Sequence, residues 1–142
     1  MRKIADLDCI MLVDDDEATN FLHRSVIRRE NLGVHVQVIT NGQEALDYLT
    51  GSEQYYPGTD LPQPGIIFLD LNMPGMNGWE FLDQYRKLPT PIRQQIALMV
   101  LTTSLNPDDE ARARQIPEVD GFLQKPLTGP KLQGIINQYF YN

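Results

Sequence analysis

Short apolar runs alternate along the chain with segments whose apolar residues recur every three or four positions. Four runs have the length and continuous hydrophobicity of buried strands, and a fifth is weaker; they cover residues 9–13, 34–39, 66–69, 96–101 and 121–124. Continuous apolar strands that alternate with amphipathic helices predict a parallel sheet covered on both faces, with right-handed crossovers. We therefore expect an α/β fold built from five strand–helix repeats.

Helix signals follow each of the first four strands. The first is a 3–4 period in Phe21, Leu22, Ser25, Val26 and Arg29. Two more helices are expected after the Asn-Gly pairs at 41–42 and 77–78. A fourth starts at 106–110, where an Asn cap precedes proline and three acids, and it has few large apolar residues to pack. An apolar stripe over 132–140 predicts a last helix, in which Tyr139 and Phe140 are expected to join the core.

Length and composition are those of one globular domain. The chain has 142 residues, 42% apolar and 22% charged, so we expect a single domain over 1–142 with its core at about 9–136. Segment 52–65 is predicted to be a long loop. The net charge of −7 disfavours binding to DNA or anionic lipid. The apolar runs are too short to span a bilayer and no signal peptide is predicted, so a cytoplasmic location is expected. Cys9 is expected to be a buried, inert thiol.

Polar residues follow the strands at the end where an open parallel sheet binds its ligands. Asp14 and Asp15 follow the first strand, Asp70 the third, Thr102 the fourth and Lys125 the fifth. Three clustered carboxylates would repel by roughly 4 kcal/mol per pair at about 4 Å, so they require a cation. Oxygen ligands suit Mg²⁺ or Mn²⁺. The alternative for the acidic run is a solvated loop that caps the following helix.

A carboxylate beside a divalent cation, an ammonium group and a hydroxyl is suited to accept a phosphoryl group. The carboxylate of Asp70 would attack, while the metal and Lys125 neutralise charge on the transferred oxygens. Thr102 could then hydrogen-bond the phosphoryl group. Plainer interpretations make Thr102 a strand residue and Lys125 a solvated chain end, although Pro126 holds Lys125 extended and so sets its direction.

These motifs resemble those of response-regulator receiver domains of two-component signalling, the CheY-like family. The matching segments are IMLVDDDE, FLDLNMPGMNGWEFL, VLTTS and DGFLQKPL, which begin at residues 10, 68, 100 and 120. They occur in the family's order at nearly its spacing, and the resemblance extends from about residue 9 to 136. It implies a doubly wound (βα)5 flavodoxin-like fold, a three-layer sandwich with sheet order 2-1-3-4-5.

The resemblance also implies a metal-assisted phosphorylation site. Asp70 would be the phosphoacceptor. The metal would be Mg²⁺ or Mn²⁺. Asp15 would bind it directly and Asp14 would bind it through water, and Asp70 and the backbone carbonyl of Asn72 would also be ligands. The domain would assist its own phosphorylation and dephosphorylation and would not be an enzyme that acts on a separate substrate.

Further roles follow from the same resemblance. Thr102 would be the switch hydroxyl, Lys125 the phosphate-binding lysine and Phe122 the aromatic switch. The Lys125–Pro126 bond is expected to be cis, and Asn72 and Ser104 occupy positions that tune the lifetime of the phosphorylated state.

The partners implied by the resemblance are proteins. The phosphoryl donor would be a sensor histidine kinase or a histidine phosphotransfer protein, with acetyl phosphate as a small donor. Because no further domain follows the last helix in the sequence, output is expected through protein contacts of the fourth helix, fifth strand and fifth helix. The domain would be a monomer or a phosphorylation-dependent dimer.

Three other classes fit the residues less well. An FMN-binding flavodoxin needs a phosphate-cradling loop where this chain has three acids at 14–16. A haloacid dehalogenase-type phosphatase needs a second acid where Asn72 stands. A receiver that signals without phosphorylation would have lost one of the site residues, and all are present. Within the receiver family, an on/off switch and a phosphate sink or shuttle remain open.

Overall fold

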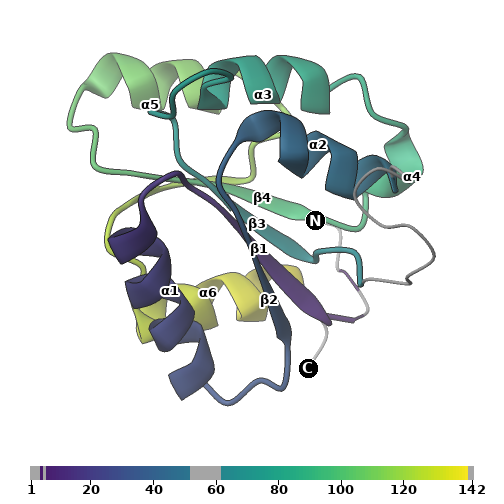
Figure 1. Ribbon diagram of the computed structural model, residues 1–142, viewed down its shortest axis with the longest axis vertical. Helices are drawn as coiled ribbons and strands as arrows, with labels where there is room; N and C mark the ends of the chain where they lie inside the picture. The colour runs from purple at the N-terminus through teal and green to yellow at the C-terminus, as the bar shows by residue number, and fades with distance from the viewer. Residues whose placement is uncertain (1–3, 5, 52–61, 141–142) are drawn as a thin grey trace.

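The chain folds around a five-stranded parallel sheet, seen in Figure 1 between two layers of helices. The computed structural model describes residues 4, 6–51 and 62–140. The strands are β1 (Cys9–Val13), β2 (His35–Ile39), β3 (Ile66–Leu69), β4 (Ala97–Thr102) and β5 (Gly121–Gln124). Their order is β2-β1-β3-β4-β5 and every neighbouring pair is parallel. The predicted doubly wound α/β fold is therefore confirmed.

Helices cover both faces of this sheet. They are α1 (Glu17–Arg29), α2 (Gly42–Thr50), α3 (Gly78–Tyr85), α4 (Thr90–Arg93), α5 (Pro107–Arg114) and α6 (Gly129–Tyr139). In Figure 1, α1 and α6 lie below the sheet, and α2, α3 and α5 lie above it. This arrangement gives the three layers expected from the resemblance.

The strand residues divide between two hydrophobic clusters because successive side chains point to opposite faces. Leu12 and Phe68 pack with residues of α1 and α6, whereas Val13 and Leu69 pack with residues of α2 and α3. Every residue of β1, β3 and β4 is buried. The end of α6 also reaches the core, as predicted, with Tyr139 7% and Phe140 2% exposed.

The first helix forms as predicted, but it buries a different face. Its buried residues are Asn20, His23, Val26 and Ile27. Phe21 is 73% and Leu22 46% exposed. The prediction of the buried face from the apolar period was therefore wrong in part. Helix α1 turns the polar side chains of Asn20 and His23 inward, toward the strand ends that carry the polar residues.

Three further differences concern the connections. Helix α4 was not predicted, since its four residues are too few to show a periodicity; it follows Pro89 and has Pro91 in its first turn. Helix α5 ends at Arg114, before Pro117, and Ala113 is the one buried residue among its eight, which fits the predicted weak packing. Of the loop predicted at 52–65, residues 52–61 lie outside the described part of the chain.

Cys9 is fully buried, and burial raises the pKa of its thiol to about 11, as expected for an unreactive cysteine. Across the described residues, none of the helices combines the length and apolar character needed to cross a membrane.

Candidate functional site

Three of the predicted site residues, Asp14, Asp70 and Lys125, stand directly beyond strands, and their backbones continue the ladder of the sheet. The Asp14 amide donates to the Ile39 carbonyl at 3.0 Å, and the Asp70 amide donates to the Val13 carbonyl at 2.9 Å. The Lys125 amide donates to the Thr102 carbonyl at 2.8 Å. The sheet therefore fixes the backbones of all three residues at one edge, as the sequence predicted.

The turn after Asp70 folds tightly back on the site. A Cβ atom on Gly78 would lie 2.7 Å from the Asp70 carbonyl oxygen and 2.7 Å from the Leu71 Cα atom, so this position requires glycine. Gly75 has a φ of +72°, which also favours glycine. Asn77 then starts α3 through a reciprocal capping box with Glu80. Close contact between the turn and α3 holds the end of β3 in place.

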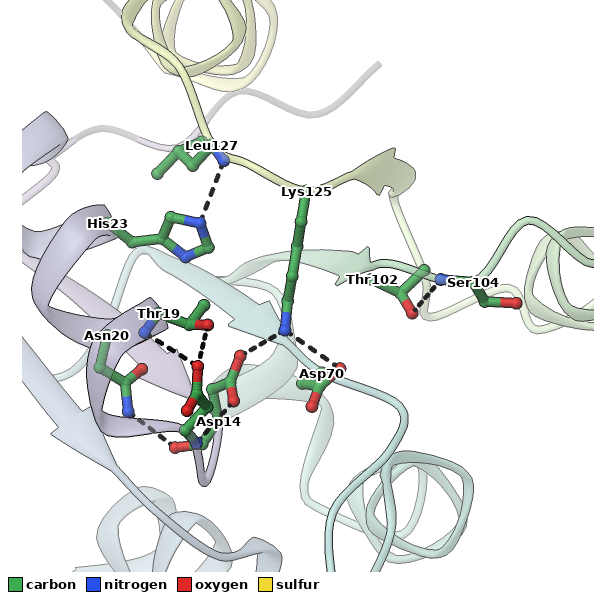
Figure 2. Close-up of polar contacts among 10 residues, drawn as sticks. Asp14, Thr19, Asn20, His23, Asp70, Thr102, Ser104, Lys125 and Leu127 are labelled. Carbon is green, nitrogen blue, oxygen red and sulfur yellow. Dashed lines mark hydrogen bonds and ion pairs between the residues drawn. The ribbon is translucent and has the colours of Figure 1, made fainter.

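Three carboxylates and one ammonium group meet at this edge. Asp14, Asp15 and Asp70 each offer an oxygen, and these oxygens lie within 4.8 Å of one another. Asp14 and Asp70 are buried, whereas Asp15 is exposed. Lys125 Nζ lies 2.6 Å from Asp14 Oδ2 and 3.5 Å from Asp70 Oδ1, as Figure 2 shows. The predicted convergence of sequence-distant residues is therefore observed.

Burial and charge shift the titration of this cluster. The pKa of Asp70 is raised, first because its carboxylate is buried and second because Asp14 repels its charge; Lys125 and the Asn72 backbone oppose the shift. Burial alone would lower the pKa of Lys125, but the hydrogen bond to Asp14 and the charges of Asp70 and Asp14 raise it overall. Negative charge therefore exceeds positive charge at the site, since one ammonium group faces three acids.

This donor set fits a hard divalent cation. Carboxylate oxygens at such separations are the ligands that Mg²⁺ and Mn²⁺ prefer, and the exposed side of Asp15 leaves room for water ligands. A cation there would also offset the repulsion that raises the pKa of Asp70. Asn72 is exposed, and its backbone lies close enough to hydrogen-bond the Asp70 carboxylate.

Thr102 is buried at the end of β4, and its hydroxyl faces the following loop. Its Oγ1 accepts a hydrogen bond from the Ser104 amide at 3.1 Å, and Figure 2 joins it to Ser104 and not to Asp70. The Ser104 hydroxyl donates to Asp109 in α5 at 2.6 Å. Hydrogen bonds therefore connect the end of β4 to the first turn of α5.

Phe122 lies on β5, at the sheet edge next to α5. It is partly buried and packs against a small cluster of Leu71, Val100 and Ala113, to which Trp79 and Val119 also contribute. The Lys125–Pro126 peptide bond is cis, as the resemblance implied.

Three polar residues around the site were not singled out from the sequence. Asn20 is 5% exposed and its Nδ2 donates to the Asp14 carbonyl at 2.8 Å. His23 is 2% exposed and contacts the segment after Lys125, as does Lys131. Polar residues at the positions where α1 should face the sheet are the signal that could have identified the first two.

The chain matches the response regulator receiver domain family over residues 10–137. Among characterised relatives, it is 32% identical over 100 residues to the response regulator Rcp1 of Synechocystis, a match that covers 70% of this chain and 65% of Rcp1. The chain thus spans just under two thirds of that relative.

Solved structures agree with the sequence match. A two-component response regulator from Cytophaga hutchinsonii is 34% identical, with a TM-score of 0.78 and coverage of 96% of this chain and 97% of that one. The Mn²⁺-bound form of Rcp1 and the phosphorylated cyanobacterial phytochrome response regulator RcpA are each 28% identical with TM-scores of 0.72. They cover 92% and 94% of this chain, and 90% and 91% of their own. The chain therefore belongs to the response regulator receiver domain family, a class of signalling domains that are phosphorylated on aspartate.

Proposed function

We propose that Asp70 is the phosphoacceptor of this domain and that its phosphorylation requires Mg²⁺ or Mn²⁺. The observation that supports this most strongly is the placement of Lys125 Nζ between Asp14 Oδ2 at 2.6 Å and Asp70 Oδ1 at 3.5 Å. An ammonium group there can neutralise charge on a phosphoryl group as it reaches Asp70. The buried carboxylate has lost part of its hydration, which favours its role as a nucleophile.

The reaction is a phosphoryl transfer from a phosphohistidine. A carboxylate oxygen of Asp70 forms a bond to phosphorus while the bond between phosphorus and the histidine nitrogen breaks, and the imidazole retains that electron pair. The product is an acyl phosphate, which water later hydrolyses to the free carboxylate and inorganic phosphate. Asp14, Asp15, Asp70 and the Asn72 carbonyl would hold the metal, which would neutralise charge on the acids and on the transferred oxygens.

The proposed donor is a histidine kinase or a histidine phosphotransfer protein, with acetyl phosphate as a small substitute. Support for a protein donor comes from the start of α1, next to the acid cluster. Phe21 is 73% and Leu22 46% exposed there, and large exposed apolar side chains are typical of protein contacts. Among the similar solved structures, RcpA is phosphorylated and Rcp1 is bound to Mn²⁺, which supports phosphorylation and metal binding in this domain but names no donor.

We propose that the output surface is formed by α5, β5 and α6. These are the predicted fourth helix, fifth strand and fifth helix, because the short helix α4 was not predicted. The Thr102 hydroxyl would move to the phosphoryl group and would no longer accept the hydrogen bond from the Ser104 amide. Because the Ser104 hydroxyl binds Asp109, this change would be passed on to α5. Helix α5 buries only Ala113 of its eight residues, so little apolar contact opposes its rearrangement. The partly buried Phe122 would turn inward in the same step.

The test is intact mass spectrometry of the protein with MgCl₂ and acetyl phosphate. The wild-type chain should gain one phosphoryl group, and Asp70→Asn should gain none. Asp83→Asn, which removes an exposed acid on α3, is the matched control and should behave as wild type. A phosphoryl group that persists in Asp70→Asn would refute the assignment of Asp70.

A further inference from the structure

The direction of Lys125 depends on the short segment that carries it. Its long side chain reaches from the end of β5 to the acids that follow β1 and β3, and this side chain is only 13% exposed. Small rotations of the backbone at its Cα atom would move Nζ away from Asp14 and Asp70. The sheet holds the Lys125 amide through the Thr102 carbonyl, and the rest of segment 124–127 needs further supports from neighbouring helices.

Helix α1 supplies one support through a buried histidine. His23 Nε2 accepts a hydrogen bond from the Leu127 amide at 3.2 Å, across 104 positions of sequence. His23 is 2% and Leu127 1% exposed, so this amide has no access to bulk water. Figure 2 shows the imidazole between α1 and the segment that follows Lys125.

Helix α6 supplies the second support. Lys131 Nζ donates to the Gln124 carbonyl at 2.8 Å and to the Pro126 carbonyl at 3.0 Å. These two carbonyls belong to the residues on either side of Lys125. The ammonium group of Lys131 and the imidazole of His23 together bind three backbone groups around the lysine, on residues 124, 126 and 127.

We propose that His23 and Lys131 are positioning residues that aim Lys125 at Asp70, an inference that rests on the proposed function of Lys125. Nε2 of His23 accepts a hydrogen bond and so carries no proton, which makes the ring neutral with its proton on Nδ1. A protonated ring would present an N–H group to the Leu127 amide and would release the segment.

The surroundings of His23 keep the ring neutral. Burial lowers its pKa below the usual 6.5, and the charges of Lys125 on the β5 side and Lys131 on α6 act in the same direction. Asp14 at the end of β1 opposes them. The support from His23 is therefore present at neutral pH and is lost only in acid, when the ring is forced to accept a proton.

A conservative pair of substitutions separates positioning from packing. In His23→Gln the amide oxygen can replace Nε2 as acceptor, whereas His23→Leu fills the space without an acceptor. With MgCl₂ and acetyl phosphate at pH 7.5, we expect His23→Leu to be phosphorylated about 10-fold more slowly than wild type and His23→Gln within about 3-fold of it. His35→Gln, which changes the other histidine of the chain, is the exposed control. Equal rates for the Leu and Gln variants would overturn the proposal.

The pH profile gives a readout that packing alone would not move. The ratio of the wild-type rate to the His23→Gln rate should be constant near pH 7.5 and should fall only as the pH drops well below 6.5, the usual imidazole pKa, because burial lowers the pKa of His23. A ratio that stays constant down to the limit of folding would contradict the role of the neutral ring.

Hydrogen exchange tests the same inference without phosphorylation. The Leu127 amide should be protected in wild type and His23→Gln and should exchange at least about 10-fold faster in His23→Leu. If wild type fails to be phosphorylated, the proposed function is wrong, and exchange alone then decides whether His23 holds the segment. Should His23→Leu not fold, Lys131→Met and Lys131→Arg provide the second pair: the Met variant should slow phosphorylation and the Arg variant should not. Equal exchange in the histidine variants, or equal rates in the lysine pair, refutes the proposal.

Discussion

Removal of the charge on Asp70 should make the metal-free domain more stable. In the absence of a divalent cation, the Asp70 carboxylate lies within 4.8 Å of oxygens on Asp14 and Asp15 and 3.5 Å from Lys125 Nζ. At an effective dielectric near 20, each acid repels Asp70 by about 3.5 kcal/mol and Lys125 attracts it by about 4.7 kcal/mol. Exposure of Asp15 screens part of its repulsion, and burial of Asp70 adds a cost. The net effect is a penalty on the order of 1–2 kcal/mol for the charged form.

The assay is thermal unfolding of wild type and Asp70→Asn in EDTA at low salt and pH 7. The variant keeps the shape of the side chain, so its melting temperature should rise by roughly 2–8 °C for a domain of this size. Asp83→Asn, which changes the net charge of −7 by the same amount at an exposed site, should shift it by much less.

The pH dependence of this difference has a definite sign. Because the folded-state pKa of Asp70 is raised above its usual 3.8, the penalty is present at neutral pH and disappears as the pH falls through that pKa. The advantage of Asp70→Asn should therefore shrink in acid. An Asp70→Asn variant that is no more stable than wild type at pH 7 without metal would refute the electrostatic reasoning.

Three further predictions concern the surroundings of the site. A Mg²⁺ concentration ten times the dissociation constant should stabilise wild type by about 1.4 kcal/mol, and the same concentration should stabilise Asp15→Asn by less. Equal stabilisation of the two proteins in thermal melts would exclude Asp15 as a ligand. Gly78→Ala should cost roughly 1–3 kcal/mol in urea unfolding because its Cβ would meet the backbone of 70–71, while Gly134→Ala, with open space around it, should be neutral or stabilising. Arg112→Gln should lower the free energy of unfolding by roughly 0.5–1 kcal/mol and change the fluorescence emission of Trp79, because the guanidinium lies 4.1 Å from the Trp79 ring centroid. Unchanged emission would argue against that contact in solution.

The main features of the fold and of the site could be predicted from the sequence because their signals are local. Apolar runs such as β1 and β3 end abruptly at acids, and parallel strands bring their carboxyl ends to one edge, so Asp14, Asp70 and Lys125 were expected to meet. The capping residues Asn77 and Asn106 likewise identified the starts of α3 and α5.

The features that were missed depend on tertiary contacts. Phe21 and Leu22 continue an apolar period but are exposed, because α1 turns Asn20 and His23 toward the sheet. Asn20 is needed there to bind the Asp14 carbonyl, and His23 to bind the Leu127 amide, which is 104 positions away in the sequence. Helix α4 is too short for any periodicity to be detected.

Chemical trapping of the phosphorylated residue tests the central claim most directly. Borohydride reduces an acyl phosphate of aspartate to homoserine, so reduction after incubation with MgCl₂ and a phosphohistidine donor marks the modified position for peptide mass spectrometry. The account predicts homoserine at residue 70 in wild type, and none there when MgCl₂ is replaced by EDTA. Homoserine at another aspartate, with residue 70 unmodified, would contradict it.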